Sequence, residues 1–216
     1  MKPHEIEEMS MRIIDEELKK QSILLPEAYA PVVKRVIHTT ADFDYAVNLF
    51  FSDDAVRKIQ EALRPETVII TDTNMALSGI SKPALAELSM RAECYMADAG
   101  ITKAAKEQQV TRASLCVKEA FRRHAQPGFV TGNAPTALYA IAEEITMGAR
   151  PAFVIAVPVG FVNVVSSKEE IIRLCKENSI PVIAARGRKG GSNVAAAIVN
   201  ALCYQKLGRI DPKNRY

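Results

Sequence analysis

This chain of 216 residues contains no tryptophan, and aromatic residues make up only 6% of it. The formal net charge at pH 7 is also small, +3, from 28 Lys and Arg against 25 Asp and Glu. Nucleic-acid binding proteins need base-stacking aromatic side chains or a strong positive field, and this chain is poor in both. We therefore expect no nucleic-acid partner. The alternative, a basic module binding nucleic acid through residues 186–189, would lose affinity steeply with salt.

Paired cysteines and long apolar segments are missing as well. The four cysteines are far apart and show no C-x-x-C spacing, which excludes a zinc cluster or a secreted disulfide framework. Residues 1–20 are acidic throughout, without the apolar stretch of an export signal, and no later apolar run approaches the ~20 residues that span a bilayer. We expect a cytoplasmic protein with reduced thiols and no membrane partner.

Two nucleotide-binding motifs are absent, G-x-x-x-x-G-K-[ST] and a G-x-G-x-x-G after the first predicted strand. Their absence argues against a nucleoside triphosphatase and a dinucleotide enzyme. Hydrophobic residues make up 48% of the chain and charged residues 25%, which suits an ordinary globular core. We expect a single domain over residues 1–216, in which 208–216 can form a loose tail.

Hydrophobic patterning predicts an α/β fold. Short apolar runs without polar alternation, each followed by a helical pattern, are typical of a parallel sheet covered on both faces. We therefore predict a three-layer α/β/α fold with about five strands. The expected strands are 67–71, 93–96, 129–131, 152–157 and 181–184, and the expected helices are 5–18, 27–38, 53–63, 101–124, 136–147, 168–177 and 193–207.

Polar and Gly-rich segments follow four of the predicted strands, at 72–74, 132–136, 158–161 and 186–192. Ligands of open parallel sheets bind beyond the carboxyl ends of the strands, so we expect these segments to meet at one edge. The last segment joins three cations to glycines at the start of a helix, which favours a carboxylate or phosphate. The alternative is a solvated basic loop with Ser192 as a helix N-cap.

Of the three histidines, His38 is the candidate for chemistry. His4 lies near the amino end, and His124 follows Arg122 and Arg123 at a basic helix end, where we expect exposure to solvent. His38 ends an apolar helical face and precedes Thr39 and Thr40, whose hydroxyl groups can orient a ring nitrogen. An imidazole transfers protons near neutral pH when its tautomer is fixed. The residues alone leave a structural role for His38 open.

Taken together, six motifs resemble those of the precorrin-8X methylmutases, also called cobalt-precorrin-8 methylmutases, and the match covers nearly the whole chain. The motifs, in chain order, are RVIHTT (35–40), TDTNM (71–75), TR (111–112), GNAPTAL (132–138), PVGFV (158–162) and RGRKGGS (186–192).

The resemblance implies an isomerase of cobalamin biosynthesis that moves a methyl group from C11 to C12 of a tetrapyrrole, with no separate cofactor and no metal site. It also implies a homodimer. His38 falls on the family's catalytic histidine. A substrate with several acetate and propionate arms needs dispersed cations and hydrogen-bond donors. The candidates for substrate binding are Ser10, Arg35, Thr39, Ser81, Lys82, Arg112, Asn133, Arg186 and Arg188. Ser10 and Ser81 have the alternative role of helix caps.

Two positions depart from the family pattern. Ala41 stands where the family usually has Gly, and residues 164–166 replace a commoner Ala-Ala-Glu, which puts a role for that carboxylate in doubt. A non-catalytic corrinoid-binding protein of the same fold is the alternative function, and turnover distinguishes the two.

Overall fold

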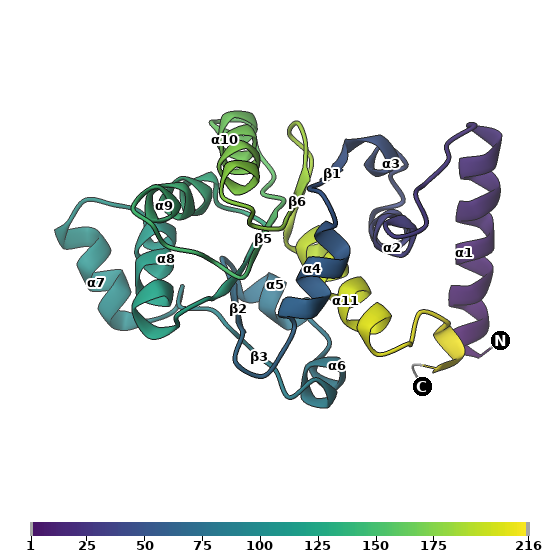
Figure 1. Cartoon of the computed structure of the whole chain (residues 1–216), viewed down its shortest axis with the longest axis horizontal. Coiled ribbons are helices and arrows are strands. Elements are labelled where there is room, and N and C mark those ends of the chain that lie inside the picture. Colours follow the sequence, from purple (N-terminus) through teal and green to yellow (C-terminus); the bar gives the residue numbers. More distant parts are fainter. Residues whose placement is uncertain (1, 215–216) are drawn as a thin grey trace.

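The computed structural model describes residues 2–214, which form the predicted three-layer α/β/α fold (Figure 1). The described residues contain a six-stranded sheet with the order β1-β6-β5-β4-β2-β3. All neighbouring strands pair in parallel except β1, which pairs antiparallel with β6. The strands are β1 (Leu49–Phe51), β2 (Val68–Thr71), β3 (Arg91–Glu93), β4 (Gly128–Thr131), β5 (Phe153–Ala156) and β6 (Val182–Ala185).

The sheet differs from the prediction at its two edges. Strand β1 was not predicted, because three residues are too few to show a period and its antiparallel pairing comes from a distant part of the chain. Strand β3 begins and ends earlier than the predicted 93–96, at Arg91 and Glu93. The four central strands are buried at every position, which is why their apolar runs were easy to recognise.

Side chains alternate across the sheet and build an apolar core on each face. In β2, Ile69 belongs to the first core, whereas Val68 and Ile70 belong to the second. The first core is enclosed by α1 (Pro3–Lys20), α2 (Ala30–Thr40), α3 (Tyr45–Asn48), α4 (Ala55–Ala62), α5 (Asn74–Gly79), α6 (Lys82–Glu87) and α11 (Ser192–Lys206). The second is enclosed by α7 (Ala99–Glu107), α8 (Arg112–Arg123), α9 (Pro135–Thr146) and α10 (Val164–Glu177).

The predicted helix 101–124 is two helices, α7 and α8. Gln109, between them, has a left-handed φ of 54°. Thr111 then caps α8 by accepting a hydrogen bond from the Ser114 amide at 3.2 Å. The break was missed because neither Gly nor Pro marks it, although a Thr ahead of a new apolar pattern is an ordinary N-cap signal.

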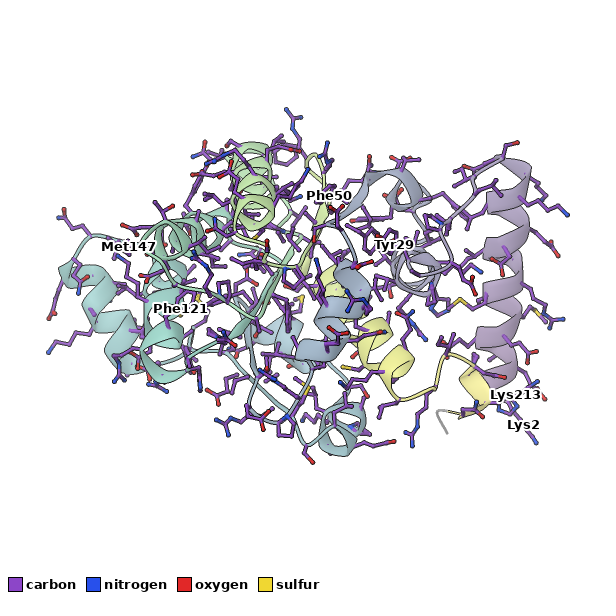
Figure 2. All side chains as sticks on the ribbon, viewed as in Figure 1. Lys2, Tyr29, Phe50, Phe121, Met147 and Lys213 are labelled. Carbon is purple, nitrogen blue, oxygen red and sulfur yellow. The ribbon has the colours of Figure 1, made fainter. Side chains whose placement is uncertain are left out.

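Helix α1 stands at one side of the molecule against α2 (Figure 1). The segment after α11 ends in the short helix η1 (Pro212–Asn214), where Pro212 is buried and Lys213 pairs with Glu8 at 3.4 Å. Lys213 and Lys2 lie close together in Figure 2, where side chains fill the spaces between the ribbons. Of the predicted tail, residues 215–216 lie outside the described residues.

Candidate functional site

The polar loops after β2, β4, β5 and β6 lie at one edge of the sheet. These strands are parallel, so their carboxyl ends point the same way, toward the edge where such sheets bind ligands. Hydrogen bonds also join the loops to one another. We call this edge, formed by residues 72–74, 132–136, 158–163 and 186–192, the rim.

Asp72 ties the β2 loop to the β4 loop. Its carboxylate accepts backbone hydrogen bonds from Gly132 at 2.8 Å and from Asn133 and Ala134 at 2.7 Å each. Burial raises the pKa of Asp72, although the three N–H donors act in the opposite direction. Asp72 thereby holds the loop that carries Asn133, whose own side chain is exposed.

Two glycines allow the rim segments to approach closely. A Cβ atom at Gly190 would lie 2.1 Å from the carbonyl oxygen of Val157, and one at Gly132 would lie 2.7 Å from the Cα atom of Ser192. No side chain fits at either position. The hydroxyl oxygens of Ser192 and Thr73 are 2.8 Å apart, which adds a side-chain link between the first and last loops.

Helix α11 begins at Ser192 with Gly191 as its N-cap, and no side chain caps its first turn. The alternative role of Ser192 as N-cap is therefore wrong, since its hydroxyl contacts Thr73 instead. Gly191 has a φ of 138°, a conformation that favours glycine. First-turn amides without a side-chain cap, together with the helix dipole, favour an anion at this point of the rim.

Two arginines of the last loop present their guanidinium groups at the surface. Arg186 is exposed, lies 5.1 Å from the centre of the Phe50 ring, and places Nη2 3.9 Å from Oε2 of Glu169. Arg188 is also exposed and lies 5.6 Å from the centre of the Phe161 ring. Aromatic faces orient both guanidinium groups while leaving their N–H groups available to a carboxylate.

Lys189, the third cation, connects this loop to the end of α2. Its Nζ atom lies 2.6 Å from Oδ2 of Asp42 and 2.5 Å from Oδ2 of Asp44. Hydrogen bonds to Asp42 and Asp44 raise the pKa of Lys189, and the bond from Lys189 lowers the pKa of Asp42. The sequence grouped Lys189 with the two arginines of residues 186–192, which we call the basic loop. In the structure, Lys189 instead holds the end of α2, which carries His38, beside this loop.

His38 and Thr39 lie in the last turn of α2, and both side chains are exposed. The Thr40 hydroxyl, expected to orient the imidazole, donates to the Val36 carbonyl at 2.8 Å instead. Ala41 ends the helix with a left-handed φ of 54°, which explains why Gly is suited to this position. The imidazole therefore stands at a solvent-facing helix end, near a loop rich in cations.

Arg112 lies farther along the same edge as the first residue of α8. The preceding Thr111 hydroxyl oxygen is 3.1 Å from that of Thr136 in the β4 loop. Arg112 is exposed and donates from Nη1 to the Met96 carbonyl at 3.1 Å, in the segment after β3. The predicted residues His38, Thr39, Arg112, Asn133, Arg186 and Arg188 are thus distributed along the rim and the segments that adjoin it.

Arg35 and Ser81 lie together elsewhere, around cavities on the α1 side of the molecule. Arg35 pairs with Glu7, Nη2 to Oε1 at 2.6 Å, and lies 5.5 Å from the centre of the Tyr204 ring. Both Arg35 and Ser81 line a cavity of about 350 Å³. Arg35 also lines one of about 590 Å³, between α1, α2, α11 and the C-terminal segment. Neither cavity contains a residue of the rim.

The remaining predicted binding residues make local contacts. Ser10 donates to the Ile6 carbonyl at 2.9 Å within α1, and Lys82 is exposed in the first turn of α6. Ser81 is the N-cap of α6, as its alternative role required, and accepts from the Ala84 amide at 3.4 Å. The structure therefore divides the predicted binding set between the rim and the α1 side.

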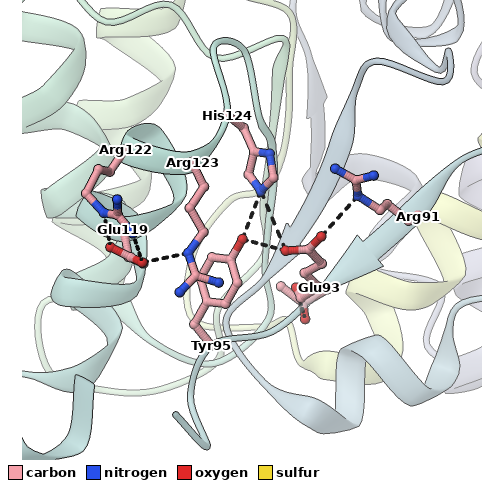
Figure 3. Close-up of polar contacts among 8 residues, drawn as sticks. Arg91, Glu93, Tyr95, Glu119, Arg122, Arg123 and His124 are labelled. Carbon is pink, nitrogen blue, oxygen red and sulfur yellow. Dashed lines mark hydrogen bonds and ion pairs between the residues drawn. The ribbon is translucent and has the colours of Figure 1, made fainter. Parts of the chain in front are cut away.

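Sequence reasoning missed a polar cluster around His124 (Figure 3). Nε2 of His124 lies 2.9 Å from Oη of Tyr95 and 3.5 Å from Oε2 of Glu93, and Tyr95 donates to that same oxygen at 2.6 Å. The His124 side chain is 13% exposed, so the expectation of an exposed histidine is wrong. Arg123 covers the Tyr95 ring at 4.6 Å.

The cluster joins the edge strand β3 to the end of α8. Burial, and then the hydrogen bond to Glu93, raise the pKa of Tyr95. Burial also acts to raise the pKa of Glu93, but the Tyr95 hydrogen bond and the charges of His124 and Arg91 outweigh it and lower that pKa. The contact pairs residues 29 positions apart, which no local pattern reveals.

Within residues 2–214, no three His, Cys, Asp or Glu side chains are grouped as metal ligands. The four cysteines are free thiols, three of them buried. No helix in the same part of the chain is long and apolar enough to cross a membrane.

Comparison with known proteins identifies relatives over almost the whole chain. The family model described as precorrin-8X methylmutase matches residues 5–205. A cobalt-precorrin-8 methylmutase of Salmonella typhimurium is 44% identical over 207 residues, which cover 94% of this chain and 95% of the relative. A precorrin-8X methylmutase of Pseudomonas aeruginosa is 34% identical over 184 residues, covering 84% of this chain and 86% of the relative.

A solved structure has the same fold. The precorrin-8X methylmutase of Thermus thermophilus superimposes with a TM-score of 0.83 at 34% sequence identity, covering 94% of this chain and 98% of the other. The likeness therefore extends from sequence to the arrangement of the whole sheet and its helices.

Proposed function

Because the chain belongs to the precorrin-8X methylmutase family, we propose that it moves a methyl group from C11 to C12 of precorrin-8X or its cobalt form. It is an isomerase of corrin ring biosynthesis, and its product is hydrogenobyrinate or, with cobalt, cobyrinate. The bond from C11 to the methyl carbon breaks, the bond from C12 forms, and no atom is gained or lost. Such a shift requires neither an oxidant nor a second substrate.

The proposed role of His38 is to place a proton, or a hydrogen-bond donor, on the tetrapyrrole. The ring system carries the reactivity for the methyl shift, so the protein need only polarise it and exclude water. The observation that carries this proposal is the position of His38. It lies in the last turn of α2 and is exposed, and the ion pairs of Lys189 with Asp42 and Asp44 hold that end of the helix against the basic loop.

Substrate carboxylates are the proposed partners of the rim. Arg186, Arg188 and Arg112 are exposed along it, and the first turn of α11 adds backbone donors. Arginine binds carboxylates in bidentate fashion, so dispersed guanidinium groups suit a ligand with several acidic arms. Thr39 and Asn133 supply exposed polar groups near the same edge. Ser10, Arg35, Ser81 and Lys82 are the proposed contacts on the α1 side.

We also propose that the chain is a cytoplasmic homodimer. Three apolar residues of α1, Ile6, Met9 and Ile13, are 52%, 43% and 53% exposed at three- and four-residue spacing. An apolar stripe of this kind is typical of a covered helix face. Free thiols suit a reducing compartment. Light scattering of the purified chain tests the dimer, and an Ile13→Asp chain that still dimerises would place the interface elsewhere.

The decisive experiment mixes the native chain with precorrin-8X, and separately with cobalt-precorrin-8, and follows the visible spectrum. A His38→Ala chain is the matched variant. Conversion by the native chain alone supports both the methylmutase and its proton donor, and the faster substrate identifies the form used. Tight binding of both forms without conversion would instead favour a corrinoid-binding protein.

A further inference from the structure

Lys168 is an unusual residue of the fold because its side chain is completely buried. It lies in the second turn of α10, directly after the rim loop 158–163, and is 0% exposed. Lysine is rarely buried to this degree unless its charge is paired. Within residues 2–214, no carboxylate forms an ion pair with it. The positive charge of Lys168 must therefore be stabilised by hydrogen-bond acceptors other than carboxylates.

Those partners are two carbonyl groups of the basic loop. The Nζ atom donates to the carbonyl oxygen of Gly187 at 3.0 Å and to that of Lys189 at 2.8 Å. The two acceptors flank Arg188, whose side chain is exposed. Turning the carbonyls on both sides inward fixes the backbone at Arg188, and a charged donor makes these bonds stronger than neutral ones. The buried Lys168 side chain thus ties the backbone of the basic loop to helix α10.

We propose that Lys168 is the positioning residue of the basic loop, holding the backbone around Arg188 so that Arg186 and Arg188 face the carboxylates of the substrate. The inference rests on the proposed function, since it assigns a role in substrate binding. Lys168 has no contact with the substrate itself, because its side chain is covered. Lys168 instead fixes the positions of the Arg186 and Arg188 guanidinium groups and limits their motion.

The titration of Lys168 supports the same role. Burial lowers the pKa of Lys168 to about 8, so its charge is lost as the pH rises through that value. Lys189, the other lysine at this loop, keeps its charge in this range, because hydrogen bonds to Asp42 and Asp44 raise its pKa. Substrate affinity should therefore weaken in this range because of Lys168.

The test compares three variants of the full chain. Lys168→Met removes the charge and both hydrogen bonds with little change in volume, and Lys168→Arg keeps a charge at every accessible pH. Lys176→Met is the control, because Lys176 is exposed near the end of the same helix. The measured quantities are kcat and KM for the substrate that the native chain converts, from near-neutral pH to about pH 9.5.

For Lys168→Met we expect KM to rise about tenfold or more, the factor that a charge-assisted hydrogen bond supplies, with kcat changed far less because His38 is untouched. The native chain should show a rise in KM above about pH 8, Lys168→Arg should not, and Lys176→Met should match the native chain. A native KM in Lys168→Met, or a native KM that stays flat to about pH 9.5, would overturn the proposal.

Amide hydrogen exchange provides an independent measurement that does not depend on turnover. In the native chain, the amides of Gly160 and Gly191, which donate to the carbonyl oxygens of Arg188 and Val157 at 3.2 and 2.8 Å, should lose protection as Lys168 is deprotonated, beyond the chemical effect of pH, while the central strands keep theirs. If Lys168→Met does not fold, the exchange of the native chain and of Lys168→Arg is compared at near-neutral pH and at about pH 9.5. Equal protection of the native loop at these two pH values overturns the proposal. A native chain that converts no precorrin overturns the proposed function, whereas the exchange result still shows whether Lys168 holds the loop.

Discussion

His38 and His124 end helices on opposite sides of the sheet, and their surroundings differ sharply. His124 is covered, with Tyr95 and Glu93 on one ring nitrogen and Arg123 over the neighbouring tyrosine ring. His38 is exposed at the last turn of α2, beside the loop of the rim that carries most of the cations. The first histidine joins two elements of the fold, and the second faces the solvent where a ligand would bind.

This comparison shows how to separate a structural histidine from one suited to chemistry. A histidine that is covered and whose hydrogen bonds join two elements of the fold stabilises that fold, and removing it takes those bonds away. A histidine that is exposed near an anion-binding loop can present its ring to a substrate. The predictions below test that division, from the largest expected effect to the smallest.

His38→Ala should lower turnover by about 10² to 10⁴-fold, the usual contribution of a positioned acid or base. Its unfolding free energy should stay within about 0.5 kcal/mol of the native value, as for other exposed positions. Turnover with the preferred precorrin and urea denaturation measure the two quantities. An unfolded His38→Ala chain would show that this histidine is structural after all.

His124→Ala should have the opposite outcome. The substitution removes the ring nitrogen that contacts the Tyr95 hydroxyl and the Glu93 carboxylate, although these two groups keep their hydrogen bond to each other. The unfolding free energy should therefore fall by about 0.5–1.5 kcal/mol, while the folded protein keeps its turnover. Arg122→Ala is the control, because Arg122 is an exposed neighbour paired with Glu119, and its loss should lower stability far less than the loss of His124. Lost turnover at unchanged stability would contradict the structural role.

Arg112→Ala extends the comparison to the arginines. It removes an exposed guanidinium group beside the rim, so substrate binding should weaken by about tenfold, with little change in stability. Arg123→Ala is the matched variant from the His124 cluster, and it should lower stability rather than affinity, because Arg123 covers Tyr95 and bonds to Glu119. Equilibrium titration measures the substrate affinity of both variants, and urea denaturation measures their unfolding free energies. Equal affinity of native and Arg112→Ala chains would remove Arg112 from the site.

Ala41→Gly sharpens the description of the helix that carries His38. Ala41 has a φ of 54°, where a Cβ atom is unfavourable, so glycine should raise the unfolding free energy by about 0.5–1 kcal/mol. Ala104→Gly, in the middle of α7, should lower it by a similar amount, about 0.5–1 kcal/mol. Thermal denaturation compares the two. A destabilised Ala41→Gly chain would mean that contacts of the methyl group outweigh the backbone strain.

Glu93→Gln probes the His124 cluster through pH. The pKa of Glu93 is lowered in the folded state, so the ionised carboxylate stabilises the fold above its unfolded pKa, and this contribution disappears as the pH falls through the folded pKa. The native chain should therefore be more stable than Glu93→Gln near neutral pH, by no more than about 1 kcal/mol, and the difference should vanish in acid. A difference independent of pH would exclude the charge as its cause.

Much of the fold follows from local sequence patterns. The central strands were predicted because each is buried at every position and is therefore an uninterrupted apolar run. The helices with strong periodicity were also found, and so was the meeting of the four loops, because it follows from parallel strands. Strand β1 and the break between α7 and α8 were missed, since three residues show no period and a left-handed Gln109 has no sequence signal.

The sequence by itself determined the α/β fold, the family and the position of His38 at a helix end, because these depend on apolar periods and on motifs that are contiguous along the chain. Only the tertiary structure decided which charged side chains remain available to a ligand. Lys189 has carboxylate partners, His124 is enclosed by Tyr95 and Glu93, and Lys168 is buried under the basic loop. The physical reason is that each of these contacts joins residues distant in the chain, and the free energy of a charge depends on what surrounds it in space rather than in sequence.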